Sequence, residues 1–150
     1  MSVTYVPADL RRLVAERAGA LCEYCLIAED DTILGCQVDH IISEKHGGMT
    51  DASNLAFACV FCNRAKGSDV GSIDWETGQF VRFFNPRSDR WTDHFRLAGV
   101  RIDGLTPIGA VTIRIFAFNV RDRLLERQAL QLSNRYPSEE ALKRHGLTAT

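Results

Sequence analysis

The sequence predicts a mixed α+β fold, and three features of its 150 residues support that prediction. Residues 7–18 and 120–132 show the apolar spacing of amphipathic helices. Two short apolar runs, 36–42 and 55–59, flank a polar loop that contains glycine, as paired strands do. Four cysteines form two Cys-x-x-Cys pairs, and this spacing predicts a zinc site.

The first expected element is a helix over residues 7–18. Pro7 fits the first helical turn, where the missing N–H would have no partner anyway. Gly19 follows the helix, and glycine commonly ends helices in a left-handed conformation. The helix leads to Cys22 and Cys25, the first cysteine pair.

The middle of the chain reads as a strand–loop–strand–helix unit. In order, we expect a loop over 28–35, a strand over 36–42, a polar loop over 43–53, a strand over 55–59 and a short helix over 61–67. Gly67 is expected to end that helix.

The segment 68–79 is rich in turn residues and is the expected boundary with a C-terminal extension. Beyond it we expect short strands within 80–91 and 94–105, with a turn at Asp103-Gly104. Residues 106–118 allow a strand, from their alternating apolar residues, or a helix, from the Thr-Pro at their start. We choose the helix.

The last expected helix covers 120–132. Its apolar residues fall on roughly one side and are Val120, Leu124, Leu125 and Leu132. The tail from Tyr136 is expected to be loosely held. The whole chain, 1–150, is expected to be a single domain, with the zinc-containing core in 1–78 and the extension in 79–150.

Composition is that of an ordinary globular protein, with 45% hydrophobic and 25% charged residues. No apolar run is long enough to span a membrane, and the N-terminus lacks a signal-peptide core, so a cytoplasmic location is expected. Cysteines stay reduced in that compartment. The fifth cysteine, Cys36, alternates with Val38 and is expected to be a small core residue.

Charge is distributed unevenly along the chain. Residues 1–78 carry six basic and twelve acidic residues, whereas residues 79–150 carry twelve basic and seven acidic residues. All but one of the basic residues in the second half are arginine, which suits bidentate phosphate contacts. The pattern favours a polyanionic partner bound by the second half.

The paired cysteines, Cys22, Cys25, Cys59 and Cys62, can satisfy a zinc ion completely. Such a closed site is structural, because no position remains for water. The alternative is four buried thiols in an ordinary core, which the repeated spacing disfavours.

The order Cys-x-x-Cys, Asp-His, Gly-Gly, Asn-Leu, Cys-x-x-Cys-Asn-x-x-Lys over residues 22–66 resembles the HNH endonuclease family. That resemblance implies a zinc-braced ββα-metal core, also called the His-Me finger, with an N-terminal helix and a C-terminal extension of short strands and helices. The third name-giving position is Asn63 rather than His, which makes the chain an H-N-N variant.

The resemblance also implies roles for four residues. His40 would be the general base, and imidazole titrates in the range that this chemistry needs. Asp39 and Asn63 would hold Mg²⁺ or another divalent cation, which would stabilise the leaving 3′ oxygen. Asn54 would bridge the loop to the backbone near His40 and fix the direction of the ring.

Several residues are candidates for phosphate contacts, each with a plainer alternative. Arg64 and Lys66 either face phosphate or form a solvated helix face. His46 contacts phosphate, helps the metal site or is a loop residue without a role. Four arginines of the extension could form a DNA-facing patch with Phe83, Phe84 and Trp91, although those aromatic residues are more readily core; the arginines are Arg82, Arg87, Arg90 and Arg96. His94 is expected to be packed.

Together these features indicate a small metal-dependent HNH endonuclease that acts on DNA, with RNA not excluded and no membrane partner. The alternatives are a zinc-dependent nucleic-acid-binding module without catalysis and a structural zinc protein. An acid–histidine pair followed by two amides disfavours the binding module, because binding alone needs no base beside a metal ligand.

Overall fold

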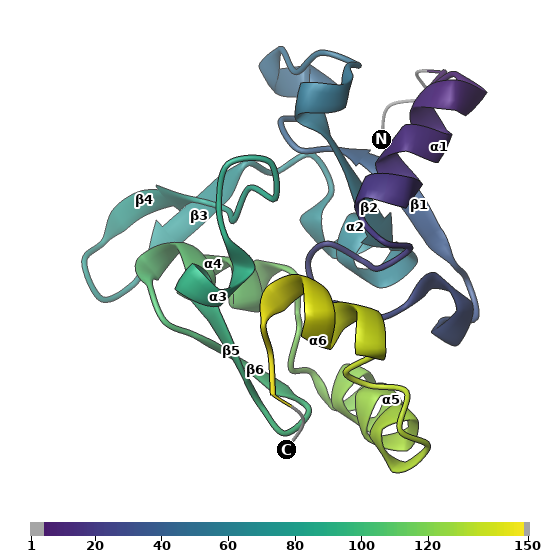
Figure 1. Ribbon diagram of the computed structural model, residues 1–150. Helices are drawn as coiled ribbons and strands as arrows, with labels where there is room; N and C mark the ends of the chain where they lie inside the picture. Colours follow the sequence, from purple (N-terminus) through teal and green to yellow (C-terminus); the bar gives the residue numbers. More distant parts are fainter. Residues whose placement is uncertain (1–4, 149–150) are drawn as a thin grey trace.

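The computed structural model describes residues 5–148 and confirms the α+β class: its helices accompany small antiparallel hairpins (Figure 1). The elements of the first half are α1 (Ala8–Arg17), η1 (Glu29–Asp31), β1 (Cys36–His40), η2 (Glu44–His46), η3 (Ala52–Asn54), β2 (Leu55–Cys59) and α2 (Val60–Lys66). Those of the second half are β3 (Gly71–Asp74), β4 (Gln79–Arg82), α3 (Trp91–His94), β5 (Phe95–Ala98), β6 (Arg101–Gly104), α4 (Pro107–Ile115), α5 (Arg121–Leu132) and α6 (Glu139–His145).

The first hairpin pairs β1 with β2, from Cys36 opposite Cys59 to His40 opposite Leu55. Helices α1 and α2 both pack against it. Side chains alternate between the two faces of a strand, and the α1 side buries Leu55 and Phe57 with Val14. The other face carries Asp39, whose partner lies on α2. The hairpin is therefore covered on both faces, as the strand–loop–strand–helix prediction requires.

The second hairpin shows that the segment 68–79 is not merely a turn-rich boundary. It contains β3, which pairs with β4, and Gly78, with a φ of +73°, lies in the connecting turn. The chain leaves the sheet after Arg82, so the short strand expected within 80–91 is present but occupies only the start of that stretch. The two strands pair from Gly71 opposite Arg82 to Asp74 opposite Gln79.

The third hairpin pairs β5 with β6, but the predicted position of its turn was wrong. Gly99, with a φ of +64°, lies in the turn, whereas Asp103 and Gly104 belong to β6. Gly104 serves close packing instead, because an added Cβ would lie 2.9 Å from the backbone nitrogen of Ala110 in α4.

Helix α4 settles the two interpretations of residues 106–118 in favour of the helix. The Thr106 side chain caps it by accepting a hydrogen bond from the Gly109 N–H at 3.1 Å. Pro107 stands in the first turn, as expected from its fixed φ.

Helix α5 exists where predicted, but its buried side is not the predicted one. Leu132 is 83% exposed, and Val120 and Leu125 are each about half exposed. The buried residues are Arg123 and Arg127. Arg127 Nε and Nη2 donate to the carbonyl oxygens of Val100 and Phe118, at 2.7 and 2.8 Å. These hydrogen bonds from the Arg127 guanidinium make burial of this side of the helix possible.

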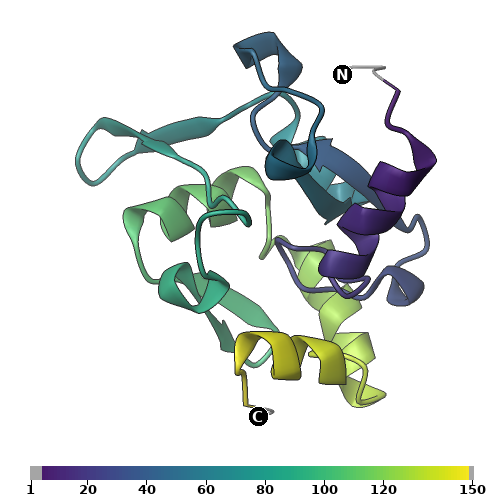
Figure 2. The same cartoon turned by 45° about the horizontal axis from the view of Figure 1, so that its top comes forward.

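The C-terminal tail is ordered, contrary to the prediction. Tyr136 is buried, and its hydroxyl donates to the Cys25 carbonyl oxygen at 2.8 Å. Helix α6 follows and lies below α1 in the view of Figure 2. There the Arg144 guanidinium donates to the Arg17 carbonyl oxygen at 2.7 Å. These two hydrogen bonds tie the tail to the first thirty residues of the chain.

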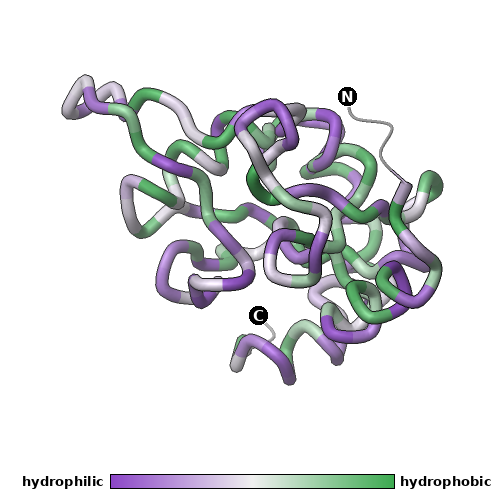
Figure 3. The backbone as a smooth tube through the Cα atoms, turned by 90° about the horizontal axis from the view of Figure 1, so that it is seen from above, coloured by the Kyte–Doolittle hydropathy of each residue, from purple (hydrophilic) through white to green (hydrophobic). Residues whose placement is uncertain are grey.

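One large hydrophobic cluster joins the two halves of the chain, since it includes Leu21 and Ile41 as well as Phe95, Phe116 and Ala141. Hydrophobic stretches along the backbone are short and interrupted by hydrophilic ones (Figure 3). Among the described residues, no helix is long and apolar enough to cross a membrane.

Candidate functional site

The four predicted cysteines lie together. Cys22 and Cys25 lie in the turns after α1, Cys59 ends β2, and Cys62 lies in the first turn of α2. Their sulfur atoms all lie within 4.8 Å of one another, and all four side chains are buried. The backbone N–H groups of Cys25 and Cys62 point at the sulfur atoms of Cys22 and Cys59, each at 3.4 Å.

This arrangement fits a tetrahedral zinc ion. Zinc–sulfur bonds of ~2.3 Å place neighbouring sulfur atoms about 3.8 Å apart, and Cys25 Sγ lies 3.7 Å from Cys59 Sγ. Burial raises the pKa of Cys22 and Cys62, so four thiolates without a cation would be unfavourable here. The cluster can therefore hold structural zinc, with no coordination position left for water.

A positive charge that the sequence did not indicate stands beside the cluster. Arg123 of α5 is buried, and its Nη2 lies 3.6 Å from Cys62 Sγ and 3.8 Å from Cys59 Sγ. Its guanidinium also lies over the ring of Phe61. Although desolvation works against its charge, the neighbouring cysteines raise the pKa of Arg123. The extension thus supplies an outer partner for the thiolates.

Cys36 lies outside the cluster, on β1 opposite Cys59 in the strand register. Its side chain is partly buried and packs against both hydrophobic clusters. Burial also raises the pKa of its thiol. These features fit the expected role as a small core residue.

His40 ends β1, and the loop 41–54 holds its ring. Its Nε2 lies 2.8 Å from Thr50 Oγ1 and 3.3 Å from Glu44 Oε1. Among the described residues, none forms a hydrogen bond with Nδ1. The side chain is 13% exposed, so it reaches solvent at one edge.

Asn54 ties this loop to the strand end. Its Oδ1 accepts from the Ile42 N–H, and its Nδ2 donates to the carbonyl oxygens of Ile42 and Met49, each at 2.9 Å. Gly48 allows this close approach, because an added Cβ would lie 1.7 Å from the Ile42 carbonyl oxygen. The expected bridge from Asn54 to the backbone near His40 is present.

Asp39 lies on the opposite face of β1 from His40, against α2. Its carboxylate is buried, and Oδ2 lies 3.2 Å from Lys66 Nζ. Lys66 also donates to the His40 carbonyl oxygen at 2.8 Å. Burial raises the pKa of Asp39, although the charge of Lys66 acts in the other direction. Lys66 thus differs from both of its predicted alternatives, since it is buried rather than at the surface.

Asn63 lies on the side of α2 that faces this strand. Its Nδ2 donates to Gln37 Oε1 at 2.6 Å. Gln37 and Asp39 share one face of β1 by strand alternation, and Asn63 and Lys66 share one side of α2 by their spacing of three residues. Asp39 Oδ2 accepts no well-aligned hydrogen bond. This oxygen lies 3.2 Å from Lys66 Nζ, so a hard divalent cation, which prefers carboxylate and amide oxygens, would have to share Asp39 with Lys66.

The two sites lie within one recognisable segment, because residues 22–69 match the family model described as HNH endonuclease. We refer to this matched segment as the HNH domain. The match covers about a third of the chain and contains the four cysteines, His40 and Asn63. No curated protein and no solved structure matches the chain.

Outside the HNH domain, the four arginines of the predicted patch are distributed over several contacts. Arg82 pairs with Asp89 at 2.7 Å, and Arg96 pairs with Asp103 at 3.3 Å. Arg87 is mostly buried and pairs with Glu23. Arg90 is exposed and pairs with no described carboxylate. The aromatic residues near them, Phe83, Phe84 and Trp91, are buried, which confirms their assignment to the core.

Two other predicted phosphate contacts of the HNH domain lie at the surface. Arg64 is exposed on α2, and His46 is exposed at the end of η2. Outside it, His94 is packed, with Nδ1 2.7 Å from Thr106 Oγ1. Sequence reasoning missed Thr50 and Glu44, which hold the HNH histidine. Their position in the loop after His40 was the available signal.

Proposed function

We propose that this chain is a metal-dependent endonuclease that hydrolyses phosphodiester bonds in DNA. The observation that carries the proposal is the ring of His40, which Thr50 and Glu44 hold through Nε2 at the strand end beside Asp39. With Nε2 as the hydrogen-bond donor, Nδ1 keeps the lone pair that a general base requires. The HNH domain supports the same chemistry.

In this proposal His40 Nδ1 takes a proton from a water molecule, and that water attacks phosphorus. Asp39 and Asn63 would hold Mg²⁺ or a similar cation, which supplies electrostatic stabilisation of the leaving 3′ oxygen when bound. Lys66 supports the arrangement because its charge opposes the rise in the pKa of Asp39 that burial causes. The products would carry 5′-phosphate and 3′-hydroxyl ends.

The exposed side chains of Arg64 and His46 would contact phosphates on either side of the cut. The arginines of the extension, among them Arg82 and Arg96, would add sequence-independent contacts by exchanging their carboxylate partners for phosphate. A reducing cytoplasm, where thiols remain available to zinc, is the compartment that suits this proposal.

The test is plasmid nicking by the wild type and by His40→Ala across titrations of Mg²⁺ and Mn²⁺. Loss of a positioned general base lowers the rate by about 10²–10⁴, and no metal concentration should restore it. Asp39→Ala should lose activity through weaker metal binding, so excess metal should restore part of it. Asn63→His should retain activity, because imidazole can also bind the cation.

His94→Asn is the matched control, since it removes an imidazole that lies outside the site. Circular dichroism should show that all variants fold. Full activity in folded His40→Ala would remove this residue as the base. A wild type that binds DNA but does not cut it in the presence of any metal tested would instead favour the zinc-dependent binding module.

A further inference from the structure

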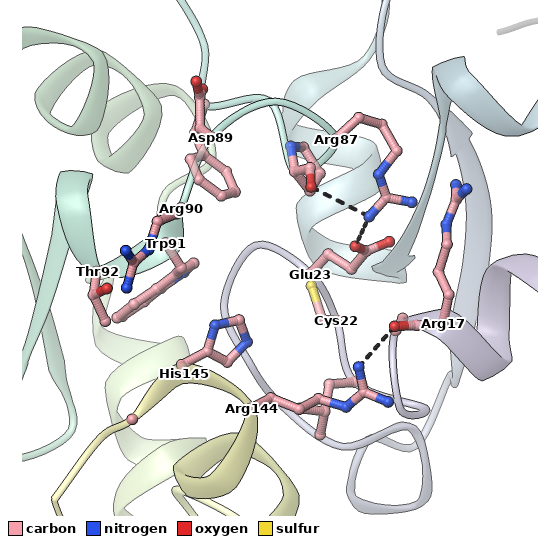
Figure 4. Close-up of a pocket in the computed structure, with 15 residues that line it drawn as sticks. Arg17, Cys22, Glu23, Arg87, Asp89, Arg90, Trp91, Thr92, Arg144 and His145 are labelled. Atoms are coloured by element: carbon pink, nitrogen blue, oxygen red, sulfur yellow. Dashed lines mark hydrogen bonds and ion pairs between the residues drawn. The ribbon is translucent and has the colours of Figure 1, made fainter.

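A cavity of about 420 Å³ opens between three segments that are far apart in the sequence (Figure 4). They are the end of α1 with the turn that follows it, the loop before α3, and the end of α6. The hydrogen bond from Arg144 to the Arg17 carbonyl oxygen joins the first and last of these segments. The cavity is thus formed only when the N-terminal helix, the extension and the tail have come together.

Arginine dominates the charge of this cavity. Four arginines line it, against only two carboxylates, Glu23 and Asp89; the arginines are Arg17, Arg87, Arg90 and Arg144. Glu23 is paired with Arg87, and Asp89 is engaged by Arg82, which lies outside the lining. Arg17 and Arg90 pair with no carboxylate among the residues that the structure describes. Arg144 pairs with Glu140 at 2.5 Å, and the charge of Glu23 also acts on Arg17. The lining still carries four guanidinium groups against two carboxylates, which is an excess of positive charge.

Two guanidinium groups converge at one wall. Arg17 Nη2 and Arg87 Nη1 both donate to the carbonyl oxygen of Leu55, at 2.6 and 3.2 Å. The pKa of Arg17 is lowered by desolvation and by the charge of Arg87. Arg17 Nε is buried and has no hydrogen-bond partner. An anion bound at this wall would relieve the repulsion between the two guanidinium groups.

This wall adjoins the proposed catalytic strand. Leu55 is the register partner of His40 in the β1–β2 hairpin. Residues paired across an antiparallel sheet have their Cα atoms about 4.5–5.5 Å apart. The convergent arginines thus hold the backbone of the residue beside the candidate base, on the β2 side.

We propose that this cavity binds one backbone phosphate of the nucleic-acid strand, next to the phosphate that is cut. The proposal rests on the proposed function for its ligand. Guanidinium groups suit phosphate because their planar donors match its oxygen atoms. His145, at the cavity edge, has its pKa lowered by desolvation and by Arg144, so the arginines carry the positive charge at neutral pH.

The experiment measures binding of a labelled duplex by fluorescence anisotropy as a function of salt concentration. All variants are made in the His40→Ala background, so that the DNA stays intact. Arg17→Gln and Arg90→Gln should each weaken binding about tenfold. The double variant should reduce the salt slope by about 0.9, the value for one phosphate contact. Arg121→Gln, which removes an exposed arginine of α5 outside the cavity, should change neither.

An unchanged affinity and salt slope in the double variant would overturn the proposal, and so would a wild type that does not bind DNA. A calorimetric titration with inorganic phosphate tests the other source of the same chemistry. Phosphate binding that is lost in the double variant, with unchanged DNA binding, would make this a site for a free anion and also overturn it.

Arg90→Gln guards against a folding artefact, because Arg90 is exposed and its side chain makes no hydrogen bond with the described residues. Plasmid nicking by the otherwise unaltered chain separates this proposal from the proposed function. Absence of nicking together with the expected change in salt slope would refute the function and keep the phosphate site. Nicking by the wild type, together with an unchanged salt slope in the double variant, would refute the phosphate site and keep the proposed function.

Discussion

At the scale of single residues, the loop around His40 depends on Gly48. We predict that Gly48→Ala destabilises the fold, because the new methyl group would meet the Ile42 carbonyl oxygen and the Asn54 side chain. The expected loss is on the order of 1–3 kcal/mol in the free energy of unfolding, as for other overpacked sites. Chemical denaturation measures it, and nicking activity should fall with it because the Asn54 bridge is displaced.

Gly47→Asn is the control for this prediction. Gly47 has a φ of +85°, but an added Cβ would meet nothing within 4 Å. Asparagine tolerates this left-handed conformation better than most residues, so the variant should remain nearly as stable as the wild type. Equal stability of both variants would show that the loop adjusts around Gly48.

The residues that sequence reasoning found are those whose meaning lies in local spacing. Two residues between paired cysteines, or an acid directly before a histidine, can be read from the chain itself. Lys66 illustrates the limit of that reading. Its pairing with Asp39 joins residues 27 positions apart, and nothing in the local pattern distinguishes a buried lysine from an exposed one on a short helix.

At the scale of elements, α5 shows how tertiary contacts override an apolar pattern. Its leucines suggested the buried side, yet Leu132 is exposed and the arginines face inward. Arg123 faces inward because thiolates attract a guanidinium, and Arg127 because carbonyl oxygens remain to be paired. In the third hairpin, Gly104 likewise belongs to a strand that packs on α4 rather than to the turn.

We predict that Arg123→Met weakens zinc retention. The purified wild type should contain one zinc per chain, and a chelator that reports zinc by absorbance should remove it slowly. The charge of Arg123 acts to lower the pKa of Cys25, so its loss lets protons compete better with zinc for the thiolates. The variant should therefore release zinc faster by about 10-fold, the low end for outer partners of a metal.

Arg121→Met tests whether any charge change on α5 has this effect, because Arg121 is exposed on the same helix. It should release zinc at the wild-type rate. Equal rates in Arg123→Met and the wild type would show that the thiolates need no partner from the extension.

At the scale of the whole molecule, the HNH domain does not form the core alone. The main hydrophobic cluster includes Phe83, Phe95, Phe116 and Tyr136 from the extension. The expectation of a core in 1–78 with a basic extension described the charge correctly but underestimated how far the two parts share one interior. Charge counts carry no information about packing between distant segments.

We predict that a chain ending at Arg135 is much less stable than the full chain. It would lack Tyr136, with its hydrogen bond to Cys25, and Ala141, both of which are fully packed in the core. Losing a buried aromatic side chain alone costs about 3–5 kcal/mol. Thermal unfolding followed by circular dichroism measures the effect, and a melting temperature equal to that of the full chain would show that the tail is dispensable.

The contact between Tyr136 and Cys25 also bears on when the protein matures during synthesis. The two residues are separated by 111 positions. At about 5–20 residues per second, the ribosome adds Tyr136 roughly 6–22 s after Cys25. The cysteine turn therefore waits for the next 111 residues before its packing is complete. A nascent chain that has not yet reached Tyr136 lacks that closure.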